Sequence, residues 1–207
     1  MLGPSWRCSS SVASRGWPSW PVSSRWGCCG LVASGHDERR RRAPPATISP
    51  HLAALRAVVG PRLLTLPGVA VAVVDDGAVV LLRHVDTGHW VLPGGMVEPE
   101  EHPADAAVRE TREETGLEIT IDRVLAVQGG PNHRIRYRNG DEVAYVTTVF
   151  AGRSVGGRLR ADGVEALEVQ RAPLDQLADV DELSPWVAEL VPTLLGPTTP
   201  TWFSPPS

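Results

Sequence analysis

Three glutamates close together in the sequence are the residues whose types and spacing most clearly point to chemistry. Glu110, Glu113 and Glu114 are spaced i, i+3 and i+4, and because each helical residue turns by about 100°, a helix places them within one arc. Like charges about 6 Å apart repel by a few kcal/mol at an effective dielectric near 20. The chain contains no Lys, and the neighbouring Arg109 and Arg112 are expected to project to other sides of the helix. The cluster therefore needs water or a cation beside it.

A divalent cation would relieve this repulsion. Mg²⁺ prefers oxygen ligands and is commonly held by a few carboxylates together with substrate phosphates. The same ion can polarise a phosphoryl oxygen and activate a bound water. The alternative is a solvated helix face, which is the usual explanation for adjacent glutamates. The setting favours the metal site, because a Gly94-Gly95 loop precedes the helix, Gly116 ends it, and the carboxylates crowd its negative end.

The segment around these glutamates resembles the signature of the Nudix hydrolases, the superfamily of the MutT-like proteins and the ADP-ribose pyrophosphatases. That signature runs Gly, five residues, Glu, seven residues, Arg-Glu, aliphatic, any residue, Glu-Glu, any residue, Gly, aliphatic. Thr111 fills one aliphatic position, and Glu100 stands where many members have Gly. The resemblance covers about residues 65–180. The matching positions are Gly95, Glu101, Arg109, Glu110, Glu113, Glu114, Gly116 and Leu117.

The resemblance implies a role for each motif residue. Glu110, Glu113 and Glu114 would bind Mg²⁺ or Mn²⁺, with Gly95 in the metal-binding loop. Arg109 and Glu101 match a pair that orients the metal-binding glutamates from behind. Of these residues, Glu113, Glu114 and Arg109 are the ones expected to take part in catalysis. The implied fold is the Nudix α/β/α sandwich, an α/β fold with a mixed β-sheet between helices.

The implied reaction is Mg- or Mn-dependent hydrolysis of a diphosphate linkage in a nucleoside diphosphate joined to another group, as in ADP-ribose or a sugar nucleotide. One alternative is a MutT-like pyrophosphohydrolase that removes damaged nucleoside triphosphates. Another is a non-catalytic Nudix module that senses a ligand, although such modules usually lack one of the motif carboxylates. A Nudix-fold isopentenyl diphosphate isomerase would be expected to use a catalytic Cys, and residues 49–195 contain none.

A general base is expected in a loop well after the motif. Glu165 is the preferred candidate, with Glu168 and Glu142 as alternatives. Arg134 and Arg136 are two residues apart, so a strand places them on one face, where they could bind phosphates of the substrate or simply face solvent. The other polar residues considered are Glu98, which could reach the ion through water, Pro131, which resembles a marker of the ADP-ribose-cleaving branch, and His84, His89 and His133, which lack metal-ligand spacing.

The composition limits the expected binding partners and cellular location. The net charge is -4, so a general nucleic-acid surface is not expected. The sequence has no run of 18 apolar residues, so no membrane-spanning helix is predicted. The expected partner is a nucleotide-type small molecule, and a homodimer is left open. Cysteine is confined to Cys8, Cys28 and Cys29, which excludes a disulfide framework for the core and favours a cytoplasmic location.

Three regions follow from composition and periodicity. Residues 1–48 hold four of the seven Trp and have no acidic residue before Asp37, which predicts an unfolded extension or a start assigned too far upstream. Residues 49–195 are predicted to be the folded domain, the Nudix domain that the resemblance implies, and residues 196–207 are predicted to be a loose tail. The predicted helices cover residues 50–59, 103–115, a turn at 174–177 and a last helix from 185 to 194, and the predicted strands cover residues 69–74, 79–82, 90–92, 119–127, 134–137, 143–150 and 167–169.

Overall fold

The computed structural model describes residues 48–137, 139–196 and 201–203. The predicted extension at residues 1–48 therefore lies, apart from Ile48, outside the described residues. In the described part of the chain, no helix is both long enough and apolar enough to cross a bilayer. The helical elements are α2 Pro50–Val59, η1 Pro131–His133, α3 Pro103–Thr115, η2 Leu174–Asp179, α4 Pro185–Ala188 and α5 Val191–Leu195.

A mixed sheet forms the middle layer of the fold. Its two longest strands, β1 (Leu64–Asp75) and β7 (Glu142–Gly157), run parallel with Leu64 opposite Val143. Most other pairings are antiparallel, namely β1 with β2 and β4, β2 with β8, and β7 with β5 and β6, whereas β5 and β9 pair in parallel. The remaining bounds are β2 Ala78–His84, β3 Trp90–Val91, β4 Gly94–Met96, β5 Leu117–Gln128, β6 Arg134–Arg136, β8 Ala166–Pro173 and β9 Trp202–Phe203.

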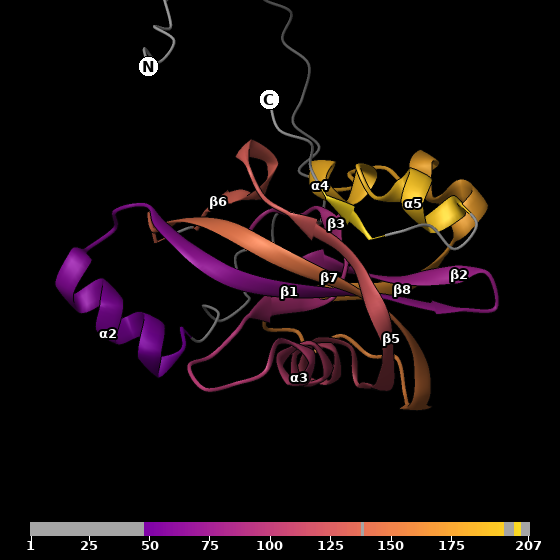
Figure 1. Cartoon of the computed structure of the whole chain (residues 1–207), viewed down its shortest axis with the longest axis horizontal. Helices are drawn as coiled ribbons and strands as arrows, with labels where there is room; N and C mark the ends of the chain where they lie inside the picture. The colour runs from indigo at the N-terminus through magenta and orange to yellow at the C-terminus, as the bar shows by residue number, and fades with distance from the viewer. Residues whose placement is uncertain (1–47, 138, 197–200, 204–207) are drawn as a thin grey trace, which may run out of the picture. The chain divides into compact units, whose positions relative to one another are not determined.

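Helices cover the two faces of this sheet, with α3 on one side and α4 and α5 on the other (Figure 1). Strand β1 packs against helices on both faces, because its successive side chains point to opposite sides of the sheet. Val69, Val71 and Val73 pack with residues of α3, whereas Ala70 and Ala72 pack with the carboxyl-terminal helices. The predicted α/β/α sandwich with a mixed sheet is confirmed.

Two local expectations are corrected by the structure. The Gly94-Gly95 segment was expected to be a loop before the helix, but Gly94–Met96 forms β4 against β1. A Cβ on Gly94 would lie 2.1 Å from the Val69 carbonyl oxygen, so only glycine permits this approach. The expected single last helix is divided into α4 and α5, because Pro192 has no N–H to donate and its ring clashes with the preceding turn.

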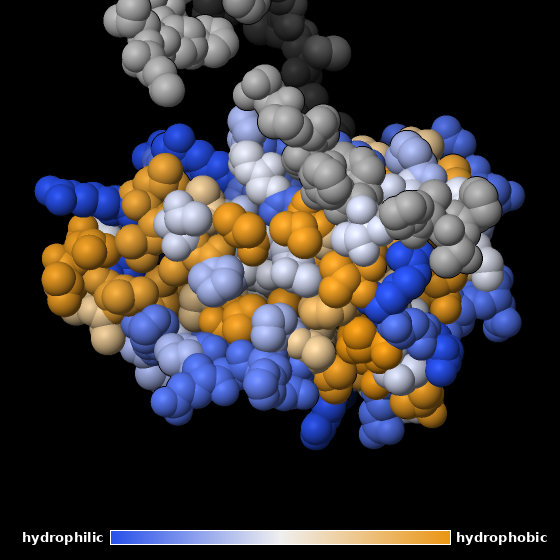
Figure 2. Space-filling model, viewed as in Figure 1, coloured by the Kyte–Doolittle hydropathy of each residue, from blue (hydrophilic) through white to orange (hydrophobic). Residues whose placement is uncertain are grey.

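Helix α2 lies at one end of the sheet (Figure 1). Ser49 caps it, since its Oγ accepts a hydrogen bond from the Leu52 N–H at 3.1 Å, and Gly60 ends it with φ 67°. None of its residues is fully buried. Hydrophobic residues gather on this part of the surface (Figure 2), where Val58 and Leu63 are exposed. The helix is therefore held by a few specific contacts rather than by the core.

Candidate active site

Helix α3 carries the motif glutamates and is fixed firmly against the sheet. It ends at Gly116, whose left-handed φ of 70° and close approach to the Arg158 carbonyl leave no room for a Cβ. Thr111, which replaces the aliphatic residue of the motif, is fully buried. Its hydroxyl donates a hydrogen bond to the Ala107 carbonyl at 2.8 Å. The helix backbone thus satisfies this polar group, and the departure from the motif does not disturb packing.

The three motif glutamates lie in different environments. Glu110 and Glu114 are nearly buried, whereas the Glu113 side chain is 59% exposed. The Glu114 carboxylate accepts a hydrogen bond from the Gly94 N–H at 2.8 Å. Gly95 leaves space for the Glu110 carboxylate, because a Cβ there would lie 2.5 Å from Glu110 Cδ. The Glu110 and Glu114 carboxylates of α3 therefore pack against the backbone of Gly94 and Gly95.

Arg109 holds the acidic cluster together. Its Nε and Nη2 donate to the two oxygens of Glu101 at 2.8 and 2.9 Å, the bidentate geometry that suits a guanidinium and a carboxylate. Its Nη1 lies 2.9 Å from Glu110 Oε1 and donates to Glu113 Oε2 at 3.2 Å. The expectation that Arg109 projects away from the glutamates is wrong, because its long side chain spans the turn to i+4.

The electrostatics of the cluster follow from burial and like charge. Burial raises the pKa of Glu114 well above its ordinary value, and the nearby charges of Glu110 and Glu165 raise it further. Burial also raises the pKa of Glu110, although Arg109 opposes this shift. In contrast, the hydrogen bonds from Arg109 lower the pKa of Glu101. A bound cation would therefore stabilise the ionised forms of Glu110 and Glu114 most, whereas the charge of Glu101 is already balanced by Arg109.

Glu165 lies with the motif carboxylates although it follows them by some fifty residues. Its loop is fixed because Asp162 Oδ1 accepts hydrogen bonds from the backbone N–H groups of Val164, Glu165 and Ala166 at 2.9, 3.1 and 2.9 Å. Burial and the charge of Glu110 raise the pKa of Glu165 to about 7. This value suits a group that must accept a proton near neutral pH.

The other two candidates for the base lie elsewhere. Glu168 is exposed on β8, and neither it nor Glu142 lines the pocket beside the carboxylates. Glu142 instead pairs with Arg134 and lies 3.9 Å from Arg136 Nε. The two arginines do line the pocket, but both are engaged with Glu142 in this structure. Binding of a phosphate by either arginine would compete with that pairing.

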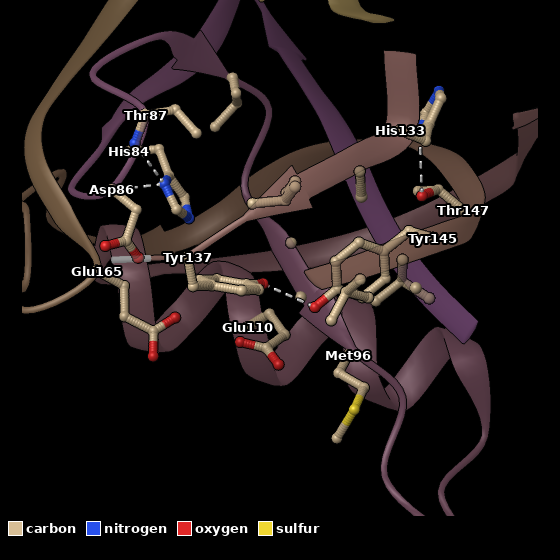
Figure 3. Close-up of a pocket in the computed structure, with 18 of the residues that line it drawn as sticks. His84, Asp86, Thr87, Met96, Glu110, His133, Tyr137, Tyr145, Thr147 and Glu165 are labelled. Atoms are coloured by element: carbon tan, nitrogen blue, oxygen red, sulfur yellow. Dashed lines mark hydrogen bonds between the residues drawn. The ribbon is translucent and has the colours of Figure 1, made fainter. Parts of the chain in front are cut away.

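A pocket of about 690 Å³ opens beside the cluster. Two tyrosines form part of its wall (Figure 3), with Tyr137 and Tyr145 hydroxyl oxygens 2.9 Å apart. Sequence reasoning missed both, although they are the only tyrosines in the chain and both fall in one predicted hairpin. His133, read from the sequence as a non-ligand, also lines the pocket and is buried beside Trp186 with ring centroids 5.5 Å apart.

The donor set suits a hard divalent cation, although the side chains are not yet arranged around one. Among the described residues, no group of three or more His, Cys, Asp or Glu side chains has the arrangement of a metal site. Glu113 faces Arg109 and Glu114 faces the Gly94 N–H. The fit rests on oxygen donors and on buried carboxylates that repel one another. A cation held by all three glutamates would compete with Arg109 for Glu113 Oε2 or bind its other oxygen.

Comparison with known proteins places this geometry in a family. The NUDIX domain family model matches residues 64–194. The chain is 35% identical over 91 residues to a putative 8-oxo-dGTP diphosphatase of Bacillus subtilis, covering 44% of this chain and 54% of that protein. It is 33% identical over 121 residues to an ADP-ribose pyrophosphatase of Methanocaldococcus jannaschii, covering 56% of this chain and 68% of that protein.

Solved structures support the same fold. The crystal structure of an ADP-ribose pyrophosphatase from Streptococcus suis superposes with a TM-score of 0.52 at 23% identity, covering 67% of this chain and 98% of that one. The chain spans about half the length of the first curated relatives that it matches, 44% of one and 54% of the other. The family match begins at β1, so helix α2 lies outside it.

Proposed function

This chain belongs to the Nudix hydrolase family, and we propose that it hydrolyses a diphosphate linkage in a nucleoside diphosphate joined to a second group, in the manner of ADP-ribose or a sugar nucleotide. The observation that carries the proposal is the convergence of Glu110, Glu114 and Glu165 on one wall of the pocket, where burial raises the pKa of each. A diphosphate with its divalent ion neutralises such a wall, whereas a neutral ligand would leave the carboxylates buried and repelling.

Different residues would carry out the separate parts of this hydrolysis. Mg²⁺ or Mn²⁺ held by Glu110, Glu113 and Glu114 would neutralise charge on the diphosphate and favour ionisation of a bound water. Glu165 accepts a proton from the water whose oxygen attacks one phosphorus. The bond from that phosphorus to the bridging oxygen breaks, and the bridging oxygen leaves with the other phosphate. Arg109 fixes the position of the glutamates, because Glu101 anchors it in a bidentate pair.

A substrate panel tests the proposal directly. ADP-ribose, sugar nucleotides, dinucleoside polyphosphates and oxidised deoxynucleoside triphosphates are each incubated with the protein and Mg²⁺ or Mn²⁺, and the products are separated. We expect turnover of a nucleoside diphosphate derivative to a nucleoside monophosphate and a second phosphate ester. The ADP-ribose pyrophosphatase relative, of which this chain covers 68%, supports this choice.

A MutT-like activity on damaged triphosphates is the second candidate. It is supported by the 35% identity to a putative 8-oxo-dGTP diphosphatase. The products separate the two activities, because a triphosphate pyrophosphohydrolase releases a nucleoside monophosphate and inorganic diphosphate instead of a second phosphate ester. Tight binding of a nucleotide with no turnover of any compound would instead favour the ligand-sensing alternative.

A further inference from the structure

Helix α2 builds part of the substrate pocket although it lies outside the residues matched by the family. The match begins at residue 64, whereas Ser49, Leu52 and Arg56 of this helix and its cap line the pocket with the glutamates. The helix contributes no fully buried residue. Its place in the fold is therefore decided by particular polar contacts, and Arg56 makes most of them.

The Arg56 guanidinium joins three segments of the chain. Its side chain is only 8% exposed. Nη1 donates to the Gly60 and Arg62 carbonyls at 3.1 and 2.5 Å, and Nη2 donates to the Glu142 carbonyl at 2.8 Å. Nε makes no hydrogen bond but lies 3.4 Å from an oxygen of Asp141. Because protein groups occupy its guanidinium, Arg56 is not expected to bind a phosphate of the substrate.

The segment that Arg56 anchors is the hairpin between β6 and β7. Strand β6 has three residues, Arg134–Arg136, and pairs with the start of β7. The Tyr137 N–H donates to the Asp141 carbonyl at 2.9 Å, which continues the pairing toward the turn. So short a strand contributes few pairing hydrogen bonds. The contacts from Arg56 to Asp141 and Glu142 therefore tie helix α2 to this hairpin, in addition to the pairing of β7 with β1 and the ion pair between Arg134 and Glu142.

Tyr137 projects from this hairpin across the carboxylates. Figure 3 shows its ring between Glu165 and Tyr145, with Glu110 nearby. Tyr145 is fixed in β7, where its ring packs so closely on Gly68 that a Cβ there would lie 3.0 Å from it. The two hydroxyls lie 2.9 Å apart. Each hydroxyl has one proton, and their mutual hydrogen bond uses one, so within the described residues the other proton remains for a ligand oxygen.

We propose that Arg56 is a positioning residue that holds the hairpin, and with it Tyr137, against the second group of the substrate. The second group must offer an oxygen acceptor to the tyrosine pair, and a sugar hydroxyl or ring oxygen meets this requirement. This inference rests on the proposed function and deepens it. Helix α2 thereby controls the affinity for the substrate, while the glutamates carry out the hydrolysis.

The test compares full-length variants in steady-state kinetics on the best substrate of the panel. Arg56→Met keeps the length of the side chain and removes its donors, whereas Arg62→Met alters an exposed arginine whose backbone carbonyl Arg56 contacts. We expect Arg56→Met to raise KM by about tenfold with little change in kcat. Arg56→Lys restores one donor group and should give an intermediate KM, and Arg62→Met should match the wild type.

A double-mutant cycle identifies the residue through which Arg56 acts. Tyr137→Phe alone should raise KM for a substrate with a sugar as its second group. If Arg56 works by placing the Tyr137 hydroxyl, Arg56→Met should raise KM much less in the Tyr137→Phe background than in the wild type. Additive effects of the two substitutions, or an equal loss of kcat in both, would overturn the proposal.

Hydrogen exchange tests the anchoring without any substrate. In Arg56→Met, the amides of residues 134–137 and 139–142 should exchange faster, while those of α3 and β1 should not change. Uniformly faster exchange would indicate a general loss of stability and would contradict a local anchor. If the panel gives no turnover, the proposed function fails and the sugar assignment fails with it, but unchanged exchange at the hairpin would refute the anchoring itself.

Discussion

The carboxylate of Glu110 occupies the space that a side chain at Gly95 would need. A Cβ on Gly95 would lie 2.5 Å from both Cδ and Oε1 of Glu110. The glycine of the motif therefore does more than form a turn, because it lets a carboxylate from α3 reach the backbone of β4. The atoms in conflict belong to the end of a flexible side chain, so a methyl group at position 95 would displace the carboxylate without breaking the sheet.

Gly95→Ala should therefore reduce activity far more than stability. We expect kcat/KM to fall by about 100-fold or more, as for the loss of several kcal/mol of transition-state stabilisation. The melting temperature should stay within about 4 °C of the wild type. Gly129→Ala is the matched control, because the atom nearest to its Cβ would be 3.7 Å away. Equal activity of the two variants would show that the position of Glu110 is unimportant.

Glu114→Gln should remove the activity and stabilise the metal-free protein. Glu114 is nearly buried, and burial raises its pKa, so a neutral amide avoids the cost of a buried charge. The amide oxygen can still accept the hydrogen bond from Gly94. We expect a loss of activity of about 100-fold or more, because the residue no longer offers a charged ligand. Thermal denaturation and kinetics on one preparation measure both effects, and full activity in this variant would refute the metal assignment.

Helix α3 shows how much of this site could be predicted from the sequence. Pro103 and Gly116 mark its two ends, and the structure places the helix at Pro103–Thr115. Local rules suffice here because a helix cap and a helical spacing depend only on neighbouring residues. The same local information was present at Pro192, where the division of the last helix could have been predicted but was not.

The tyrosine wall of the pocket could not be predicted in this way. Arg56 and Glu142 are separated by 86 positions, and they meet only because β1 and β7 pair in parallel. Tyr137 reaches the glutamates of α3 through the same pairing. Such contacts depend on the register of the whole sheet, so neither residue type nor spacing reveals them in a single sequence. Glu165 was preferred from its position in a loop after the motif, and its place in the pocket depends on Asp162.

The bidentate pair between Arg109 and Glu101 gives a prediction about positioning. Arg109→Lys keeps the positive charge but cannot make both hydrogen bonds to Glu101. We expect about a 10- to 100-fold fall in activity or metal affinity, as for other residues that orient metal ligands. Arg112→Lys is the control on the same helix, because Arg112 is exposed. Activity against Mn²⁺ concentration separates weaker metal binding from slower hydrolysis, and identical titrations for the two variants would contradict the role of the pair.

The final prediction concerns pH and the metal. Burial raises the pKa of Glu165 in the folded state from an ordinary 4.5 to about 7, so the folded protein holds more protons than the unfolded chain between these values. Its stabilising contribution is complete below about pH 4.5 and is lost as the pH rises through 7. The metal-free protein should therefore lose stability over this range, and Glu165→Gln should lose less, with Glu168→Gln as the exposed control.

Since an ion competes with protons for the carboxylates, Mg²⁺ should raise the melting temperature more at pH 8 than at pH 5.5. Thermal denaturation across this range, with and without Mg²⁺, measures both effects. An equal response at the two pH values would show that the ion does not bind the buried cluster.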